Sequence, residues 1–370
     1  MRFFTANHTN RHEPVVCRFD FTRLILFIFV IIFFSFIFSS CTKQDTSRIE
    51  LALGTVCGVT LFDNARNSVY DDIFSRIQKI ENLMSVNIPS SDISRINSAA
   101  GIEPVQVHEE VFKVIERAKY FAEISGGAFD PTVGPLVSIW GIGSENQRVP
   151  AREEIDAVLP LINHRLLELD AVTRSVFLTQ KGMALDLGAI AKGYAADVAA
   201  ETAIDAGIKS AKIDFGGNIV LTGIKADKTP WKVGIRNPQK DSGSIIGILQ
   251  ITVLPANFPS VKTIVTSGVY ERYFEKDGNH YHHIFDPSTG YPAEKGLISV
   301  TLVTDISMDA DALSTAVFVL GFEEGIRLLE SFPGTEAVFV FKDKTIITTS
   351  RAAFSLTDME YTMINTDLSL

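Results

Sequence analysis

The chain has 370 residues, 46% of them hydrophobic, and a formal net charge of −10. This length and apolar content allow a large core, while the acidic balance excludes a typical nucleic-acid-binding protein, which presents basic surfaces. The three cysteines, Cys17, Cys41 and Cys57, are too few for a disulfide scaffold.

Residues 1–40 are predicted to form a secretory signal peptide. Four arginines precede an apolar run from Leu24 to Phe38, and small residues follow it. This order of basic, apolar and small residues is typical of such signals. The run is also shorter than the roughly 20 apolar residues of a membrane span.

The cysteine that follows these small residues resembles the lipobox of bacterial lipoproteins. We therefore expect Cys41 to be acylated and residues 41–48 to be a lipidated tether. This places the protein at the periplasmic face of a bacterial inner membrane, anchored through lipid only. Ordinary cleavage near Ser40 and an uncleaved anchor are the alternatives. Cys57, left without a partner, is expected to pack as a buried thiol.

Beyond the tether, hydrophobic periodicity predicts alternating helices and strands. Apolar residues at helical spacing indicate helices, and short apolar runs between turn residues indicate strands. The predicted segments, in chain order, are a strand at 49–62, a helix at 68–84, a helix at 111–121 that Gly126 and Gly127 stop, a loop as far as Trp140, a hairpin at 167–178, a helix at 189–207, a strand at 211–214, a strand-rich region at 231–304, helices from Asp311 and at 323–331, and strands at 337–341 and 345–348.

This interleaving of helices with many short strands indicates an α+β fold. We expect a single compact domain at residues 49–351, with mixed or antiparallel β subdomains and flanking helices. Residues 352–370 are expected to form a C-terminal extension.

A glycine-rich string follows the second predicted helix and reads Ser-Gly-Gly-Ala-Phe-Asp-Pro-Thr-Val-Gly-Pro-Leu at 125–136. Glycines let the backbone approach a ligand closely, and exposed N–H groups then hold phosphate or a ring carbonyl. A helix C-cap followed by a turn accounts for Gly126 and Pro131, but not for the whole string.

The sequence Leu-Asp-Leu-Gly-Ala-Ile-Ala-Lys-Gly-Tyr at 185–194 places Lys192 in the first turn of a helix. Amides at a helix start attract anions. A cation there opposes the helix dipole, so Lys192 is expected to have a negative partner. A solvated lysine is the alternative. Asp186, earlier in the string, is predicted to end a strand.

Three histidines, His280, His282 and His283, occur within four positions. On a strand the first two face one way and His283 the other. No HExxH or CxxC pattern accompanies them to complete a zinc site. We therefore expect one of them to act as an acid/base or as a phosphate contact.

Asp311 and Thr315 lie four residues apart in a segment that reads as a helix start. On a helix they share one face, where they would offer two oxygen ligands of the kind that Mg²⁺ or Ca²⁺ takes. Such residues also occur near helix starts without a metal. In combination with the other three motifs, the pair favours a metal site.

Together these four motifs resemble the ApbE family, the FAD:protein FMN transferases, over roughly residues 50–351 and in the same order. Leu-Gly-Thr-Val at 53–56 and Met-Ser-Val-Asn at 84–87 match two further family segments. The resemblance implies that FMN is transferred from FAD to a Thr or Ser of a target protein, with AMP released and Mg²⁺ required. It further implies that the acceptor is a membrane redox-pump subunit.

The same resemblance assigns the site residues. It implies that Mg²⁺ is held by the Ala189 carbonyl, Asp311 and Thr315, and that His283 is the acid/base. The residues expected to contact FAD are Val56, Asn87, Ala128, Phe129, Asp130, Asp186, Lys192 and Ile284.

Two positions depart from the family pattern: Asn87 stands where Tyr is frequent, and Val56 where Met is frequent. The loss of an aromatic ring should loosen that edge of the site and admit water. The nearest alternative is therefore a Mg²⁺-dependent FAD diphosphatase, which yields FMN and AMP on the same site. A non-enzymatic flavin-binding lipoprotein is a further alternative, although the intact pair of Asp311 and Thr315 argues against it.

Overall fold

A computed structural model of the chain describes residues 47–240, 243–253, 261–365 and 368. The predicted signal peptide, Cys41 and most of the tether at 41–48 lie outside these residues. Within the described residues, no helix has both the length and the apolar character needed to cross a bilayer.

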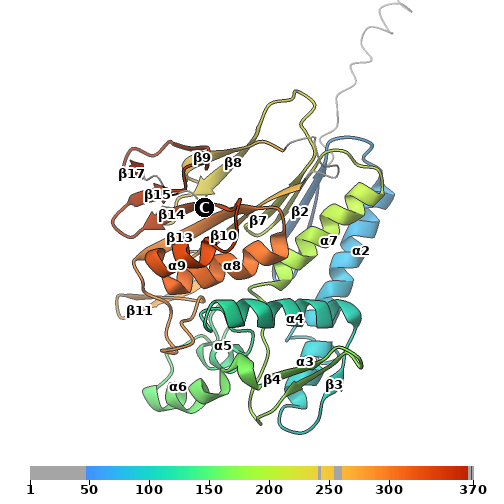
Figure 1. The fold of residues 1–370 in the computed structure, drawn as a ribbon, viewed down its shortest axis with the longest axis vertical. Helices are drawn as coiled ribbons and strands as arrows, with labels where there is room; N and C mark the ends of the chain where they lie inside the picture. Colours follow the sequence, from blue (N-terminus) through green and yellow to red (C-terminus); the bar gives the residue numbers. More distant parts are fainter. Residues whose placement is uncertain (1–46, 241–242, 254–260, 366–367, 369–370) are drawn as a thin grey trace, which may run out of the picture. The chain divides into compact units, whose positions relative to one another are not determined.

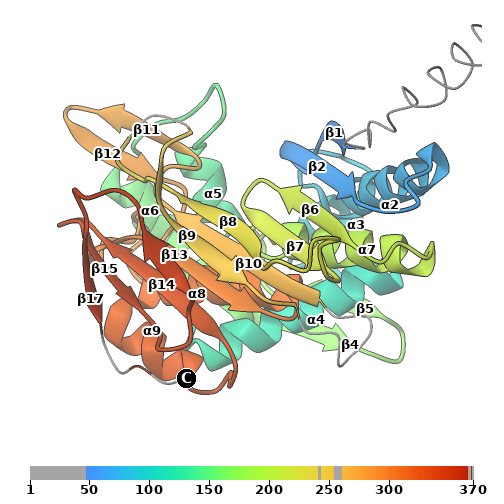
Figure 2. The same ribbon diagram turned by 90° about the horizontal axis from the view of Figure 1, so that it is seen from above.

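The largest sheet in the described residues has nine strands (Figures 1 and 2). Its neighbouring strands pair antiparallel, except the last two, which are parallel. Across the sheet, the strands are β1 (Ser47–Ala52), β2 (Thr55–Leu61), β6 (Ala211–Phe215), β7 (Asn218–Thr222), β10 (Val261–Gly268), β13 (Leu297–Thr304), β14 (Glu336–Phe341), β15 (Thr345–Thr348) and β17 (Thr362–Asn365).

Smaller sheets and helices complete the described structure. The smaller sheets are formed by β8 (Trp231–Arg236), β9 (Ile245–Ile251) and β16 (Phe354–Leu356), by β11 (Tyr273–Lys276) and β12 (Asn279–His282), and by β3 (Val105–Gln106), β4 (Leu167–Asp170) and β5 (Ser175–Leu178). The helices are α2 (Asn67–Met84), α3 (Asp92–Ser98), α4 (Glu109–Ile124), α5 (Gly134–Trp140), α6 (Arg152–Val158), α7 (Ala191–Asp205), α8 (Ser307–Leu320) and α9 (Phe322–Leu329), with 3-10 turns η1 (Leu159–Leu161) and η2 (His164–Leu166).

Apolar side chains cover both faces of the nine-stranded sheet. On one face, α2, α7 and α8 pack against the strands and form the main core, with α4 against α8 (Figure 1). On the other face, β8, β9 and β16 cover β7, β10, β13 and β14. Because α8 lies between α4, α7 and the sheet, it is buried on nearly all sides. The predicted α+β class is confirmed.

The helix expected at 68–84 is confirmed as α2, and its apolar residues at helical spacing are the buried ones. The strand expected at 49–62 is instead a hairpin. Leu53 and Gly54 join β1 to β2 with φ angles of 54° and 67°. Two positive φ angles make a type I′ turn, which suits the twist of a hairpin. The local signal for this turn is the single glycine.

The loop expected as far as Trp140 contains α5. Pro135 lies in the first turn of this helix, where its missing N–H has no cost. Gly134 allows the helix to begin close to another segment, because a Cβ there would lie 2.6 Å from the Ala184 carbonyl oxygen. The sequence reading therefore missed a helix of only seven residues.

Further parts of the fold were not expected, among them the helix α6. Ser91 caps the short helix α3, accepting the N–H of Ser94 at 3.0 Å. Residues beyond 351 contribute β16, which pairs with β9, and β17, which pairs with β15. Phe354 of β16 is buried in the second core. The segment expected to be an extension thus adds strands to two sheets.

Candidate active site

Turns from distant parts of the sequence meet at one end of the nine-stranded sheet. The β6–β7 turn contacts the start of β2, where a Cβ at Gly216 would lie 2.1 Å from Thr55 Oγ1. Arg272, which follows β10, donates from Nη2 to the Gly54 carbonyl in the β1–β2 turn at 3.3 Å. The segment at 53–56 is therefore joined to the region that leads to the histidines.

The first turns of α7 lie against α8, and Gly193 permits this approach. A Cβ at Gly193 would lie 2.2 Å from the Ser307 carbonyl oxygen and 2.8 Å from Asp311 Cβ. The Gly193 N–H donates to Asp311 Oδ2 at 2.9 Å, and Lys192 Nζ lies 3.4 Å from Asp311 Oδ1. The expected negative partner of Lys192 is thus confirmed as Asp311, which is only 3% exposed.

The hydrogen bond from the Gly193 N–H to Asp311 leaves the carbonyl oxygen of Ala189 without its usual helical donor. In a regular helix the N–H of Gly193 would bond to the carbonyl of Ala189, four residues earlier. It bonds to Asp311 instead, and in the described residues no hydrogen bond is made to the Ala189 carbonyl oxygen. Thr315, one turn beyond Asp311, lies with Oγ1 3.4 Å from Ser267 Oγ. A carboxylate, a hydroxyl and a free carbonyl are donors that fit Mg²⁺.

Contacts from α4 and α7 hold the first turn of α8. The two carboxylate oxygens of Asp197 accept the N–H groups of Ser307 and Met308 at 2.8 Å each, which caps the helix from its neighbour. Asp309 forms a two-bond ion pair with Arg117, with 2.7 Å for each bond. Since α8 begins at Ser307, the acidic residue of the candidate metal site lies in its second turn rather than at its start.

In the glycine-rich string, two of the side chains that were expected to contact FAD are buried. Asp130 is 6% exposed and accepts hydrogen bonds from Thr132 Oγ1 at 2.6 Å and His164 Nδ1 at 2.9 Å. The Phe129 ring is 4% exposed and packs against α4. These side chains therefore shape the loop. The expectation of exposed backbone donors is wrong for most of the string, because the N–H groups of residues 126–129 and 132–134 are all hydrogen-bonded within the protein. Ala128 is half-buried.

This string is joined to the loop that precedes α7. The Asp186 N–H donates to the Pro131 carbonyl at 2.9 Å. The Asp186 carboxylate accepts the N–H of Gly188 at 2.7 Å, and the Gly188 carbonyl accepts from Lys192 Nζ at 3.1 Å. Asp186 and Lys192 thus belong to one connected loop. The strand expected to end at Asp186 is reduced to a single β-bridge.

The three histidines have separate partners. His280 and His282 each donate from Nε2 to a backbone carbonyl at 3.1 Å, and they share one face of β12, as expected. His283 Nδ1 lies 3.2 Å from the Arg272 carbonyl oxygen. No three His, Cys, Asp or Glu side chains of the described residues are grouped closely enough to hold a metal.

His283 has the chemical form of a general base. Because a carbonyl oxygen only accepts, Nδ1 carries the ring proton and Nε2 keeps its lone pair. The His283 N–H also donates to the Arg272 carbonyl, at 3.1 Å, which holds the residue in place. Burial, followed by the Arg272 charge, lowers the pKa of His283 to about 3. The imidazole is therefore neutral at physiological pH.

Because His282 is buried, we expect the folded protein to lose stability as the pH falls. Burial lowers the pKa of His282 to about 4, whereas the unfolded value is about 6.5. As the pH falls from 6.5 to 4, the unfolded chain gains a proton that the folded chain does not, so stability should decrease by up to about 3 kcal/mol. Urea unfolding at pH 7 and pH 4.5 measures this. His282→Gln, whose amide retains a donor toward Ala293, should show a smaller decrease; an equal decrease would contradict the assignment.

The remaining residues that were expected to contact FAD differ in their exposure to solvent. Val56 is 53% exposed and Asn87 is also exposed. Their segments are joined because the Leu53 N–H donates to Glu81 Oε1, near the end of α2, at 3.0 Å. Ile284 is 6% exposed, and its N–H and carbonyl are both hydrogen-bonded within the protein. Ile284 therefore supports the histidine segment from the core.

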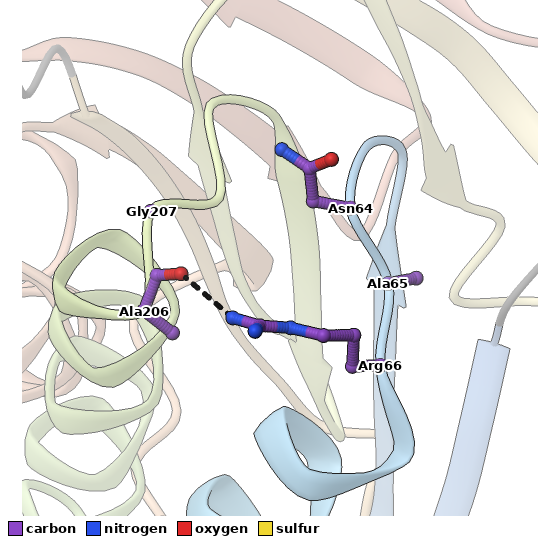
Figure 3. Close-up of a pocket in the computed structure, with 5 residues that line it drawn as sticks. All are labelled: Asn64, Ala65, Arg66, Ala206 and Gly207. Carbon is purple, nitrogen blue, oxygen red and sulfur yellow. Dashed lines mark hydrogen bonds between the residues drawn. The ribbon is translucent and has the colours of Figure 1, made fainter.

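A hollow of about 460 Å³ lies elsewhere, between the start of α2 and the end of α7 (Figure 3). Its lining residues are Asn64, Ala65, Arg66, Ala206 and Gly207. Arg66 Nη2 donates to the Ala206 carbonyl at 3.5 Å, and a cation at a helix C-terminus is favoured by the helix dipole. None of the motif residues lines this hollow, so we do not assign it to the site.

Two residues of the site were not expected from the sequence, Gly193 and Arg272. Gly193 had one signal, a glycine inside a predicted helix, which often marks a close packing contact. Arg272 belongs to no motif, and only its contacts with Gly54 and His283 reveal its position.

Comparison with known proteins identifies the family. An FAD:protein FMN transferase of Treponema pallidum is 39% identical over 322 residues, which is 82% of this chain and 86% of that protein. Another, from Klebsiella pneumoniae, is 40% identical over 295 residues, or 79% of this chain and 89% of that protein. The crystal structure of the Thermotoga maritima ApbE protein superposes with a TM-score of 0.73 at 34% identity, covering 85% of this chain and 97% of that one.

The flavin transferase ApbE of Vibrio cholerae superposes with a TM-score of 0.70 at 27% identity, covering 84% of this chain and 96% of that one. The family model itself matches residues 53–339, which include all four motifs. The chain belongs to the ApbE family.

Proposed function

We propose that the protein is an FAD:protein FMN transferase, which moves FMN from FAD to a Thr or Ser hydroxyl of an acceptor protein and releases AMP. The observation that carries this proposal is the position of His283 at the same end of the sheet as the oxygen donors of α7 and α8. Its Nδ1 is bonded to the Arg272 carbonyl, and its Nε2 has no hydrogen-bond partner among the described residues. The transferases of Treponema pallidum and Klebsiella pneumoniae, at 39% and 40% identity, support the proposal.

The acceptor hydroxyl is proposed to lose its proton to His283 Nε2 as its oxygen attacks the flavin-side phosphorus of FAD. The bond from that phosphorus to the bridging oxygen breaks, and the electron pair leaves with AMP. Lys192 Nζ, which the Gly188 carbonyl and Asp311 hold in place, is proposed to stabilise the negative charge on the departing phosphate. The acceptor is thereby joined to FMN through a phosphoester bond.

Asp311, Thr315 and the Ala189 carbonyl are proposed to hold Mg²⁺. When bound, the ion neutralises charge on the diphosphate. The protein contributes one carboxylate to this set, as suits a Mg²⁺ site that takes its other ligands from water and substrate phosphates. Hydrogen bonds from Gly193 and Lys192 orient that carboxylate before any ligand arrives.

We also propose that Cys41 carries the lipid anchor and that the acceptor is a membrane redox-pump subunit at the periplasmic face. The order of residues 1–41 supports the anchor. Mass spectrometry of the N-terminal peptide from native membranes tests it. An unmodified Cys41 at the start of the mature chain, or a peptide that continues upstream of it, would refute lipidation.

The function is tested by mixing the protein with FAD, Mg²⁺ and a candidate acceptor and measuring the acceptor by mass spectrometry. A mass gain equal to FMN on a Thr or Ser is expected. Free FMN and AMP without that gain would identify a diphosphatase. If FAD stays intact both with each acceptor and without any acceptor, the protein is neither a transferase nor a diphosphatase.

His283→Gln should reduce transfer by roughly 100- to 10,000-fold, which is the usual contribution of a general base. The amide retains a donor but cannot take a proton. FAD affinity, measured by flavin fluorescence, should change little. His280→Gln is the matched control, since His280 Nε2 donates to the carbonyl of Val269, which directly follows β10. Equal rates for wild type and His283→Gln would remove His283 from the reaction.

Asn87 supports the diphosphatase as a second candidate. This residue is exposed, and in the described residues its side chain has no hydrogen-bond partner, so it offers little cover against water. Asn87→Tyr should slow AMP release without acceptor or tighten FAD, because ring stacking contributes roughly 0.5–1.5 kcal/mol. Both quantities are measured on the two proteins side by side. If neither changes, Asn87 lies outside the site.

A further inference from the structure

Arg272 lies against three segments of the chain, two of which belong to the candidate site, although it belongs to none of the motifs. Its guanidinium donates to the Gly54 carbonyl at 3.3 Å. Its Cδ would lie 3.5 Å from a Cβ at Gly143, in the loop after α5. Its carbonyl accepts from both the N–H and the Nδ1 of His283. One residue therefore connects the β1–β2 turn with the candidate base.

The guanidinium of Arg272 has unused hydrogen-bonding capacity. It is exposed, and in the described part of the chain it forms no ion pair. The adjacent carboxylate, Glu271, pairs with Arg236 at 3.5 Å instead. An arginine has five N–H donors in a planar fork, and the protein uses one nitrogen here. Free donors on an exposed cation are the features that recognise phosphate.

We propose that Arg272 binds the flavin-side phosphate of FAD, the phosphate to which the acceptor becomes attached. This inference deepens the proposed function and rests on it. A base that deprotonates the attacking hydroxyl must lie beside the attacked phosphorus, and Arg272 holds His283 through its own carbonyl. Lys192 is tied to Asp311, so the two cations are fixed to different partners and serve different phosphates.

Phosphate binding at Arg272 would also change the proton affinity of His283. The Arg272 charge is one of the causes that lower the pKa of His283. A phosphate on the guanidinium offsets that charge, so substrate binding raises the proton affinity of Nε2. The base would then be strongest when the phosphate is in place.

The experiment compares ligands that differ only by a phosphate. FMN and riboflavin binding are measured by flavin fluorescence, and AMP and adenosine binding by calorimetry, all without divalent metal. The proteins are wild type, Arg272→Ala, Arg272→Lys and Arg327→Ala, which removes another exposed guanidinium, on α9. Arg272→Ala should weaken FMN by about 10- to 100-fold, the usual range for a hydrogen bond to a charged group.

Riboflavin, AMP and adenosine should bind Arg272→Ala as they bind wild type, and Arg272→Lys should fall between the two for FMN, since it keeps the charge but not the fork. An unchanged FMN-to-riboflavin ratio in Arg272→Ala would refute the inference, and so would a loss confined to AMP. In both cases FAD binding and transfer by wild type leave the proposed function standing. A wild-type protein that binds neither FAD nor FMN would overturn the function itself.

Discussion

Asp311→Ala is expected to reduce Mg²⁺-dependent turnover by about 1,000-fold, since a metal ligand contributes several kcal/mol of charge stabilisation. The side chain is 3% exposed and receives hydrogen bonds from the backbone of Gly193 and from Lys192. Its loss also removes the partner that orients Lys192. Turnover is measured as AMP release, and metal binding as the electron paramagnetic resonance signal of added Mn²⁺.

The control for this variant is Asp309→Asn, two residues away on the same helix. Asp309 pairs with Arg117 rather than with the site. This variant should lose some thermal stability and keep both Mn²⁺ binding and AMP release in the folded protein. Normal Mn²⁺ binding and turnover by Asp311→Ala would exclude the metal assignment. FAD binding without metal should persist in both variants.

Gly193→Ala is expected to destabilise the protein by roughly 1–3 kcal/mol, the usual cost of overpacking. In an ordinary helix this change would be favourable by up to about 1 kcal/mol. Here the new Cβ would meet the Ser307 carbonyl oxygen at 2.2 Å. That atom belongs to the backbone, so a rotamer change cannot relieve the clash, and α7 must move away from α8.

The displacement should also reduce activity, because the Gly193 N–H and Lys192 both contact Asp311 across this interface. A shift of about 1 Å can cost around 100-fold in rate. Urea unfolding and AMP release are measured together. Glu201→Ala, at an exposed position of the same helix, should leave both within error of wild type. Unchanged stability in Gly193→Ala would mean that the two helices can separate freely at this point.

Periodicity located the long amphipathic helices because each has one apolar face against the core. α2 and α4 follow the expected spacing, and their buried residues are the apolar ones. The same reading missed α3, α5 and α6, which are seven residues each. A helix so short depends on caps and neighbouring contacts more than on its own pattern. The turn between β1 and β2 was missed for a related reason, since only Gly54 marks it.

The motifs named Lys192, Asp311 and Thr315 as candidates for chemistry, and the resemblance to the ApbE family singled out His283 among three histidines. The sequence also predicted that Lys192 needs a negative partner, because a cation opposes the dipole at a helix start. It did not say which carboxylate, since the partner lies 119 positions away in the chain. Only the packing of α7 on α8 decides that, through a glycine that has room for hydrogen alone.

Tertiary structure also decided which side chains of the motifs are buried and which are exposed. Phe129, Asp130 and Ile284 lie in the expected motifs, yet their side chains are buried among other residues. Arg272, outside every motif, stands exposed between Gly54 and His283. A local sequence pattern records residue types and spacing, so it determined which segments are candidates for the active site. The direction of each side chain depends on neighbours that are distant in the sequence, and only the folded chain brings them together.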